Sequence, residues 1–188
     1  MESNKYIRLA ADLQTDSIVD GPGLRAVLWT QGCKHHCPGC QNPQTWDFNG
    51  GGLVPIDMVK EAISELEYHT GLTISGGDPM FQPAECLEIS KYAKSLGLNI
   101  WVYTGFTFEE LLKLSKKDKV YLELLKNIDV LVDGRFILKE RDLSILFRGS
   151  RNQRLIDVPN TLKKGEIVLF DEKEYMEEES FKRKPMYV

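Results

Sequence analysis

Apolar runs of strand length alternate along the chain with amphipathic segments of helix length. The runs are rich in aliphatic, β-branched and aromatic residues, and they are too short for ordinary helices. Polar or glycine-containing stretches lie between them. We therefore predict strands at 24–30, 72–75, 98–103, 128–132, 154–158 and 166–170.

The segments between these runs carry apolar residues at helical spacing and signals for helix starts and ends. Pro83 suits the first turn of a helix, and Gly97 suits the position just past its end. Thr107 followed by Glu110 has the spacing of a capping box, in which each side chain accepts a backbone N–H of the other residue. We predict helices over about 56–68, between Pro83 and Gly97, from Thr107 onward, and over about 120–126.

This order of elements predicts an α/β fold. Repeated strand–helix–strand units form a mostly parallel sheet with crossover helices. No internal repeat or low-complexity linker divides the 188 residues. We expect one domain over 1–188, with its core at about 6–170 and a charged C-terminal tail at 171–188.

Residues suited to chemistry stand directly after four of the predicted strands. The strand at 24–30 opens onto a loop with three cysteines, and later strands end at 76–79 (GGDP), Thr104 and Asp133. In parallel sheets, binding and catalysis collect at the carboxyl ends of the strands. We therefore expect these residues to form one site.

Charge and hydropathy narrow the class of protein. The formal net charge of −4 disfavours a nucleic-acid binder, which usually has a basic surface. No apolar run reaches the ~20 residues that span a bilayer. The first residues, MESNKYIRLAADLQTD, show neither a signal-peptide pattern nor a lipidation motif. We expect a cytoplasmic protein that has neither nucleic acid nor a membrane as its partner.

Three of the four cysteines, Cys33, Cys37 and Cys40, fall within eight residues. A disulfide framework would need paired, dispersed cysteines in an exported chain. The fourth, Cys86, shares an apolar helical stripe with Ile89, so we expect it to be a buried thiol. The clustered cysteines indicate a metal site or redox chemistry.

The spacing Cys-x-x-x-Cys-x-x-Cys suits an iron–sulfur cluster, in which each thiolate ligates one iron. Three cysteines can hold three irons of a [4Fe–4S] cluster and leave the fourth open to another ligand. The alternative is a zinc ion held by the cysteines and either His35 or His36. Both histidines lie inside the first cysteine gap, where reaching the same ion is awkward. We favour the cluster and interpret His35, His36 and His69 as solvated residues.

Several segments together resemble a known superfamily. The cysteine loop followed by SGGDP (75–79) resembles the radical S-adenosylmethionine (AdoMet) enzymes, and SIVDGPGLR (17–25) looks like the opening of the glycyl-radical-enzyme activases. The whole order is similar to the activases of anaerobic ribonucleoside-triphosphate reductase over about 17–157. Position 39, where the superfamily usually has an aromatic residue beside the adenine, is a glycine, as in this activase family. The other segments are CPGCQNPQTW (37–46), WVYTGFTFEEL (101–111), DVLVDGRF (129–136) and FRGSRNQRLID (147–157).

The resemblance implies a fold, an activity and partners. The fold would be an incomplete, TIM-like α/β barrel of the radical AdoMet type, because 188 residues are too few for the ~250 of a closed eightfold barrel. AdoMet would bind the open iron and be cleaved to methionine and a 5′-deoxyadenosyl radical. The radical would pass to a glycine of anaerobic ribonucleoside-triphosphate reductase, and a flavodoxin or ferredoxin-type donor would supply the electron.

The resemblance also indicates residues that bind AdoMet. Gly76 and Gly77 would let the backbone approach the methionine moiety, and Asp78 would face its ammonium group. Gly39 and Gln41, which flank Cys40, would contact AdoMet through backbone groups. Three further candidates are Thr104, Asp133 and Asn152. For these three, strand-end capping or a solvated loop is the competing interpretation.

Arginines within these segments have expected roles too. Arg25, next to the DGPG turn at 20–23, is expected to help shape the cluster site. Arg135, Arg148 and Arg151 are candidate docking charges for the reductase, although each could be an ordinary surface residue.

Two alternatives lie within the same superfamily, and one lies outside it. The first is an activase of another glycyl radical enzyme, of the pyruvate formate-lyase type. The second is a small-molecule radical AdoMet enzyme such as 7-carboxy-7-deazaguanine synthase. The third is a zinc-stabilised interaction module without catalysis.

Overall fold

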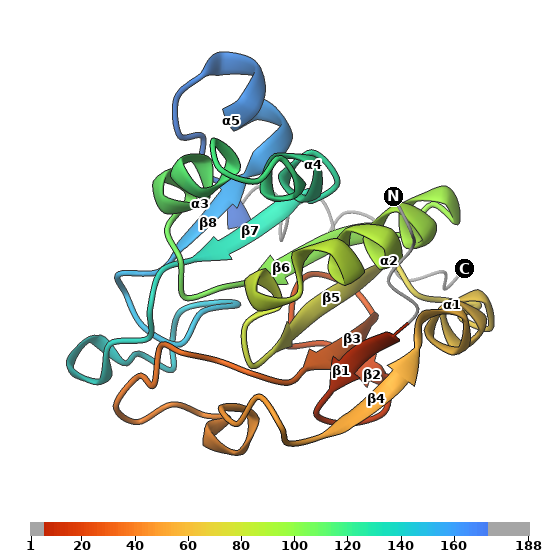
Figure 1. Cartoon of the computed structure of the whole chain (residues 1–188). Coiled ribbons are helices and arrows are strands. Elements are labelled where there is room, and N and C mark those ends of the chain that lie inside the picture. Colours follow the sequence, from red (N-terminus) through yellow and green to blue (C-terminus); the bar gives the residue numbers. More distant parts are fainter. Residues whose placement is uncertain (1–5, 173–188) are drawn as a thin grey trace, which may run out of the picture.

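The computed structural model describes residues 6–172, and an eight-stranded sheet runs through them (Figure 1). The strands follow the order β4-β1-β3-β5-β6-β7-β8, and β2 pairs with β3 beside this path. Of the predicted charged tail at 171–188, residues 173–188 lie outside the described residues. The strands are β1 Tyr6–Leu9, β2 Gln14–Ser17, β3 Arg25–Thr30, β4 Gly52–Pro55, β5 Gly71–Gly76, β6 Asn99–Tyr103, β7 Val130–Asp133 and β8 Arg154–Asp157.

The centre of this sheet is parallel and both flanks are antiparallel. β3, β5, β6 and β7 run parallel, as helical crossovers require. β1 pairs antiparallel with β3 and β4, β2 with β3, and β8 with β7. The prediction of a mostly parallel sheet is therefore correct only for the four central strands. Loops join β1 to β2, β2 to β3 and β7 to β8, and of the flanking strands only β4 is followed by a helix, α1 (Ile56–Ser64), that leads to a central strand, so the sheet as a whole is mixed.

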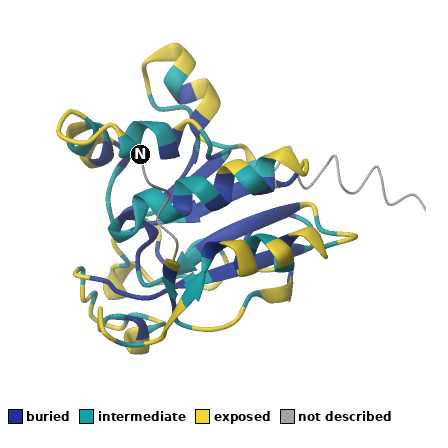
Figure 2. Cartoon of the chain, turned by 45° about the vertical axis from the view of Figure 1, so that its right-hand side comes forward, coloured by how far each residue is buried: buried dark blue, intermediate teal, exposed yellow. Residues whose placement is uncertain are grey.

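Helices α1 to α4 cover one face of the central strands (Figures 1 and 2). The main core lies between them and contains Leu28, Ile74 and Val102 from the strands and Ile89 from α2. A smaller apolar cluster around Trp101 packs on the opposite face. Because both faces are covered, the central strands are buried along their length (Figure 2). The helices are α1 Ile56–Ser64, α2 Pro83–Ser95, α3 Phe108–Ser115, α4 Val120–Leu125 and α5 Val158–Lys164.

The helix signals in the sequence are confirmed, but the predicted end of one helix and one predicted strand are wrong. Pro83 stands in the first turn of α2, and Thr107 and Glu110 form the predicted capping box of α3. However, α1 ends at Ser64, four residues before the predicted end. The predicted strand at 166–170 is wrong: the segment after α5 makes only an isolated bridge between Leu169 and Ile156.

The parallel strands place the predicted site residues at one edge. The cysteine loop follows β3, the GGDP segment follows β5, Thr104 follows β6, and Asp133 ends β7. In Figure 1 the orange loop after β3 and the cyan excursion after β7 project from the same side of the sheet. Among residues 6–172, no helix is long and apolar enough to cross a membrane.

Candidate functional site at the carboxyl edge of the sheet

The cysteine loop is closed at its base by backbone hydrogen bonds. The N–H of Gly32 donates to the carbonyl of Thr45 at 2.8 Å, and the N–H of Cys33 donates to that of Trp46 at 3.1 Å. Near the tip, Cys40 N–H donates to the carbonyl of Cys37 at 3.0 Å. The three cysteines are therefore carried by one closed loop.

Each of the three sulfur atoms lies near backbone N–H groups. The sulfur of Cys33 receives hydrogen bonds from the backbone of His35 and His36, and Cys37 receives one from Phe136, on the excursion after β7. Asn42 N–H lies 3.4 Å from Sγ of Cys40. Such N–H groups stabilise thiolates, and hydrogen bonds to sulfur are among the features that tune iron–sulfur clusters.

Burial acts in the opposite direction on the same thiols. Cys33 is 7% exposed, and burial raises its pKa to about 11, while the backbone N–H groups partly offset this. Burial also raises the pKa of Cys37, against its bond from Phe136 and the nearby charge of Arg135. A raised pKa means that these cysteines are neutral thiols in the free loop, so a bound cation must displace their protons and offset the charge of the buried thiolates.

The donor set fits a cluster better than a single zinc ion. Within residues 6–172, no three His, Cys, Asp or Glu side chains converge closely enough to hold one metal ion. Cys37 nevertheless interacts electrostatically with both Cys33 and Cys40, so the three sulfurs share one neighbourhood. A cubane uses separate irons at its corners and so accepts sulfurs that are farther apart than the ligands of one zinc ion.

Cys86 is a buried thiol, as its helical stripe predicted. It is fully buried in the main core, and its Sγ donates to the carbonyl of Pro79 at 3.5 Å. Burial raises its pKa well above the ordinary value.

Gly76 and Gly77 join the end of β5 to the start of the cysteine loop. Gly77 N–H donates to the carbonyl of Thr30 at 2.7 Å, and Asp78 N–H donates to that of Gly32 at 3.0 Å. A Cβ on Gly76 would stand 2.5 Å from the carbonyl oxygen of Thr30, and one on Gly77 would stand 2.5 Å from that of Gly32. These glycines are therefore required by backbone contact within the protein, whatever ligand binds there.

The carboxylate of Asp78 is 1% exposed and is surrounded by protein donors. Oδ1 accepts from Met80 N–H at 2.9 Å, and Oδ2 accepts from Gly105 N–H at 2.9 Å. The hydroxyl of Thr104 lies 3.0 Å from both oxygens, and Nε2 of His35 lies 2.8 Å from Oδ2. Contact of Asp78 with an AdoMet ammonium stays a prediction, and it would require the carboxylate to give up one of these donors.

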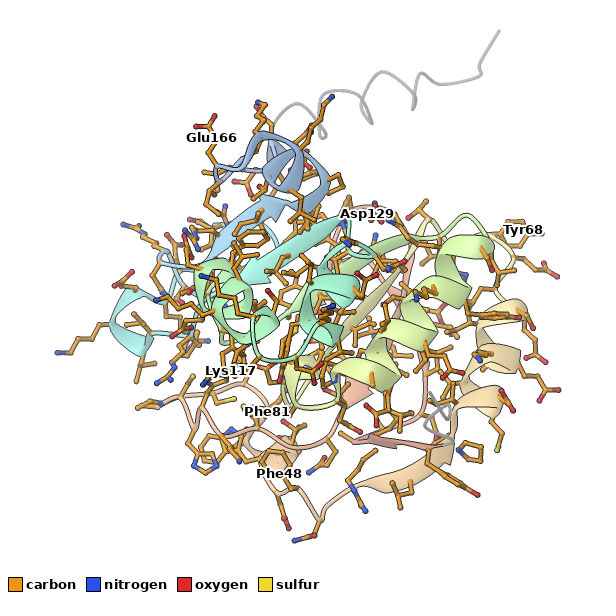
Figure 3. All side chains as sticks on the ribbon, turned by 45° about the horizontal axis from the view of Figure 1, so that its top comes forward. Phe48, Tyr68, Phe81, Lys117, Asp129 and Glu166 are labelled. Atoms are coloured by element: carbon orange, nitrogen blue, oxygen red, sulfur yellow. The ribbon has the colours of Figure 1, made fainter. Side chains whose placement is uncertain are left out.

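His35 is not the solvated residue that the sequence suggested. Its side chain is 6% exposed and its ring packs edge-on against Phe106, with centroids 4.7 Å apart. Phe81 lies beside it at 5.8 Å and in turn contacts Phe48 at 5.4 Å; Figure 3 labels Phe81 and Phe48. His36 is exposed, as expected, and its ring lies 4.7 Å from that of Trp46. The difference arises because only His35 points toward the sheet.

Asp133 forms an ion-pair network that joins three elements. It accepts from Arg154, its register partner on β8, and from the N–H of Phe108 in the first turn of α3. Arg154 also binds both carboxylate oxygens of Glu109, at 3.0 and 2.8 Å. These contacts agree with the capping interpretation of Asp133, and its predicted contact with a ligand stays untested.

Asn152, Gly39 and Gln41 are the more open candidates. Asn152 donates to the carbonyl of Arg135 at 2.8 Å, and its Oδ1 is enclosed without a hydrogen-bond partner among the described residues. An acceptor of this kind is available to a ligand donor. Gly39 is exposed and has φ of +76°, and Gln41 is exposed beside it.

Arg25 lies at the other end of the sheet. It begins β3, pairs in register with Gly71 at the start of β5, and so stands a whole strand away from the cysteine loop. The expectation that Arg25 helps to shape the cluster site is therefore wrong. The sequence motif placed it near the cysteines, but the six residues of β3 separate the two.

A hollow of about 500 Å³ lies beside β8 and is lined by Arg148, Arg151, Arg154 and the segment 169–172. Arg148 makes two contacts of 2.7 Å with Glu172. Arg151 pairs with Asp142, and its side chain is 74% exposed. Of the three candidate docking charges, Arg135 and Arg151 are exposed, and Arg148 is held by the end of the described chain.

Sequence reasoning missed two members of the site, the backbone of Phe136 and the side chain of His35. Phe136 belongs to the motif DVLVDGRF, but a backbone N–H leaves no mark in a sequence. The signal for His35 was present in the glycine that follows Thr104. A Cβ on Gly105 would lie 2.4 Å from the ring of His35, so this glycine makes room for it.

Comparisons with known proteins show which family this chain is similar to. A family model described as a 4Fe-4S single cluster domain matches residues 19–156. A protein of Enterobacteria phage T4 named anaerobic ribonucleoside-triphosphate reductase-activating protein is 41% identical over 146 residues, which cover 73% of this chain and 86% of the relative. The protein of the same name from Escherichia coli K12 is 37% identical over 145 residues, 72% of this chain and 90% of its own.

Among solved structures, QueE from Escherichia coli has a TM-score of 0.46 and 16% identity, over 54% of this chain and 53% of its own. The family model and the curated relatives each cover more than two thirds of this chain. The chain belongs to the family of anaerobic ribonucleoside-triphosphate reductase-activating proteins and contains that family's 4Fe–4S domain.

Proposed function

We propose that this chain is a radical AdoMet activase that reductively cleaves AdoMet and generates a glycyl radical on anaerobic ribonucleoside-triphosphate reductase. One observation carries the proposal. Three cysteines of one closed loop, each with backbone N–H groups at its sulfur, stand at the carboxyl edge where the other motif segments end. The names of the relatives support the choice of reductase as the partner.

Cys33, Cys37 and Cys40 would hold a [4Fe–4S] cluster and leave one iron for AdoMet. When bound, the reduced cluster and AdoMet supply one-electron cleavage of the sulfonium. The chain's own contribution is orientation and exclusion of water. The closed base of the loop fixes the ligands, and the contact of Gly76 and Gly77 with Thr30 and Gly32 sets the loop against β5.

The AdoMet site would lie along the same edge, within a single domain of the partial-barrel, TIM-like type. Backbone groups of Gly39, Gln41, Gly76 and Gly77 would contact the ligand. The enclosed Oδ1 of Asn152 is suited to accept a ligand hydrogen bond. Asp78, Thr104 and Asp133 complete the proposed set, although their present contacts are with protein groups.

A protein substrate must bring its glycine into contact with the reacting carbon, because so reactive a radical cannot diffuse unquenched. The strand order of the described sheet begins at β4 and ends at β8, and these two strands do not pair, so the sheet does not close around the site. Exposed Arg135 and Arg151 would meet the reductase near the excursion after β7. A flavodoxin or ferredoxin-type protein would deliver the electron.

The test is anaerobic incubation of the reduced protein with AdoMet and the cognate reductase, followed by electron paramagnetic resonance. The expected result is a glycyl radical doublet on the reductase and synthesis of deoxyribonucleotides. A radical on pyruvate formate-lyase, and none on the reductase, would reassign the partner. A colourless protein that contains zinc after anaerobic purification would overturn the cluster as well.

A further inference from the structure

We propose that His35 positions the cluster-binding loop by donating a hydrogen bond to Asp78, and that Asp78 and Thr104 serve as the anchor for this bond. The inference rests on the proposed function, in that the loop of Cys33, Cys37 and Cys40 carries the cluster. It assigns a role to a histidine that is neither a metal ligand nor a solvated residue.

The bond crosses from the cysteine loop to the sheet. Nε2 of His35 lies 2.8 Å from Oδ2 of Asp78, and the two side chains are 6% and 1% exposed. An ionised carboxylate can only accept hydrogen bonds, so Nε2 is the donor. A hydrogen bond to a charged acceptor, shielded from water, is among the stronger ones in proteins.

Asp78 is itself fixed, so it can orient the loop. Met80 N–H, Gly105 N–H and the hydroxyl of Thr104 all donate to its carboxylate. With His35 added, four donors serve the two oxygens, which matches their four lone-pair sites. The carboxylate therefore joins the cysteine loop, the segment after β5 and the segment after β6.

The surroundings of His35 are shaped for an imidazole ring. Phe106 packs edge-on against it, Phe81 lies on another side, and Gly105 leaves space that a Cβ would fill. Phe106 is held in turn, because its N–H donates to Thr104 Oγ1 at 3.1 Å and its carbonyl accepts from Gly134 N–H at 3.0 Å. Contacts within the protein thus set the ring position.

His36 provides a matched control in the same cysteine gap. It is exposed, and within residues 6–172 the one aromatic ring that packs against it is that of Trp46. Phenylalanine at either position keeps an aromatic ring and removes the N–H groups. Comparing His35→Phe with His36→Phe therefore isolates the bond to Asp78.

The first measurement is hydrogen–deuterium exchange of the full chain without a cluster. In His35→Phe we expect the amides of 32–46 to exchange about tenfold faster or more, since a charge-assisted hydrogen bond is lost. In His36→Phe they should stay within about twofold of the wild type. Exchange in β5 and circular dichroism should be unchanged in both. Equal exchange of 32–46 in the two variants would overturn the proposal.

The second measurement uses the reconstituted protein. We expect His35→Phe to lose iron on dilution at least about tenfold faster than His36→Phe, and to show a shifted cluster reduction potential. His35→Gln, which restores an N–H donor, should recover part of both. A variant that keeps the wild-type potential and iron content would contradict the positioning role. If wild-type protein holds its cluster but makes no glycyl radical, the proposed function fails while the exchange result still tests His35.

Discussion

The two ends of the parallel strands each enclose a buried charged side chain, but they hold it with different parts of the chain. At the amino end, Arg25 donates to Thr73 and to the carbonyls of Leu72 and Asn99, and its guanidinium lies 5.5 Å from the Trp101 ring centroid. These partners are residues of the sheet itself. At the carboxyl end, Asp78 is held by groups from loops that follow three strands.

This difference separates stability from chemistry within one sheet. A charge held mainly by strand residues, as Arg25 is apart from its bond to the Pro22 carbonyl in the turn before β3, fixes the sheet and lies away from the loops of the carboxyl edge. A charge held by loops fixes the positions of those loops relative to one another, and the cysteines lie in one of them. In parallel α/β proteins the amino end commonly supports the fold and the carboxyl end supports the site. Changes at the two ends should therefore have different effects.

The largest effect should follow from the cysteines themselves. Replacing Cys33, Cys37 or Cys40 by Ala should abolish both cluster binding and AdoMet cleavage while the chain still folds. Cys86→Ala, in the main core, should cost ~1 kcal/mol of stability and leave cleavage largely intact. Iron content, visible absorption and methionine release measure this. Loss of the cluster in folded Cys86→Ala would show that the ligand assignment is wrong.

At the amino end, Arg25→Met should destabilise the fold without changing the site. The substitution removes several buried, charge-assisted hydrogen bonds, so we expect a loss of roughly 2–4 kcal/mol in the free energy of unfolding. Urea unfolding measures this loss, with exposed Lys117→Met as the control. The folded fraction should still bind a cluster and cleave AdoMet. Normal stability combined with loss of the cluster would reverse the assignment of the two ends.

At the carboxyl end, Gly77→Ala should disturb the loop more than the fold. Its Cβ would meet the backbone of Gly32 at 2.5 Å, and overpacking of this kind costs about 1–3 kcal/mol. Gly52→Ala is the matched control, because Gly52 also lacks a positive φ and nothing lies within 4 Å of its added Cβ. We expect Gly77→Ala alone to bind less iron after reconstitution. Equal iron content in the two variants would contradict the role of this contact.

The central strands and their helices could be predicted because each is a local pattern. β3, β6 and β7 contain continuous apolar runs and β5 is a short run rich in apolar and β-branched residues, while α3 begins with a capping box that lies entirely within four residues. Of the flanking strands, β8 was predicted as 154–158, whereas β1, β2 and β4 gave no such signal. β2 is largely exposed and polar (QTDS), and β4 is an exposed edge after a glycine-rich stretch. Their pairing is decided by the sheet they join.

The site was predictable in its location and less so in its contacts. Strand order placed the cysteines, Asp78, Thr104 and Asp133 at one edge, and the structure has them there. The orientation of Asp78 toward His35, 43 residues earlier, and toward Thr104, 26 residues later, is a tertiary property that no local pattern encodes. The same holds for Phe136, which reaches Cys37 with its backbone alone.

The smallest expected effect concerns the outer ion pair of the carboxyl end. The Arg154 guanidinium lowers the pKa of Glu109 from 4.5 to about 2. A lowered pKa in the folded state adds stability above pH 4.5, and this is lost as pH falls from about 4.5 toward 2. Because the Glu109 side chain is 52% exposed, solvent screening limits the contribution to below ~1 kcal/mol.

Glu109→Gln should therefore lower the unfolding free energy slightly at pH 7 and flatten its decline between pH 4.5 and 3, as measured by urea unfolding at each pH. Glu61→Gln, at an exposed position of α1 with no ion pair found among the described residues, should leave the profile unchanged. Cluster content should be the same in both variants, since Asp133 still holds Arg154 between β7 and β8. A lower cluster content in Glu109→Gln would mean that the network around Arg154 also sets the cysteine loop, and that the carboxyl end acts as one unit rather than through Asp78 alone.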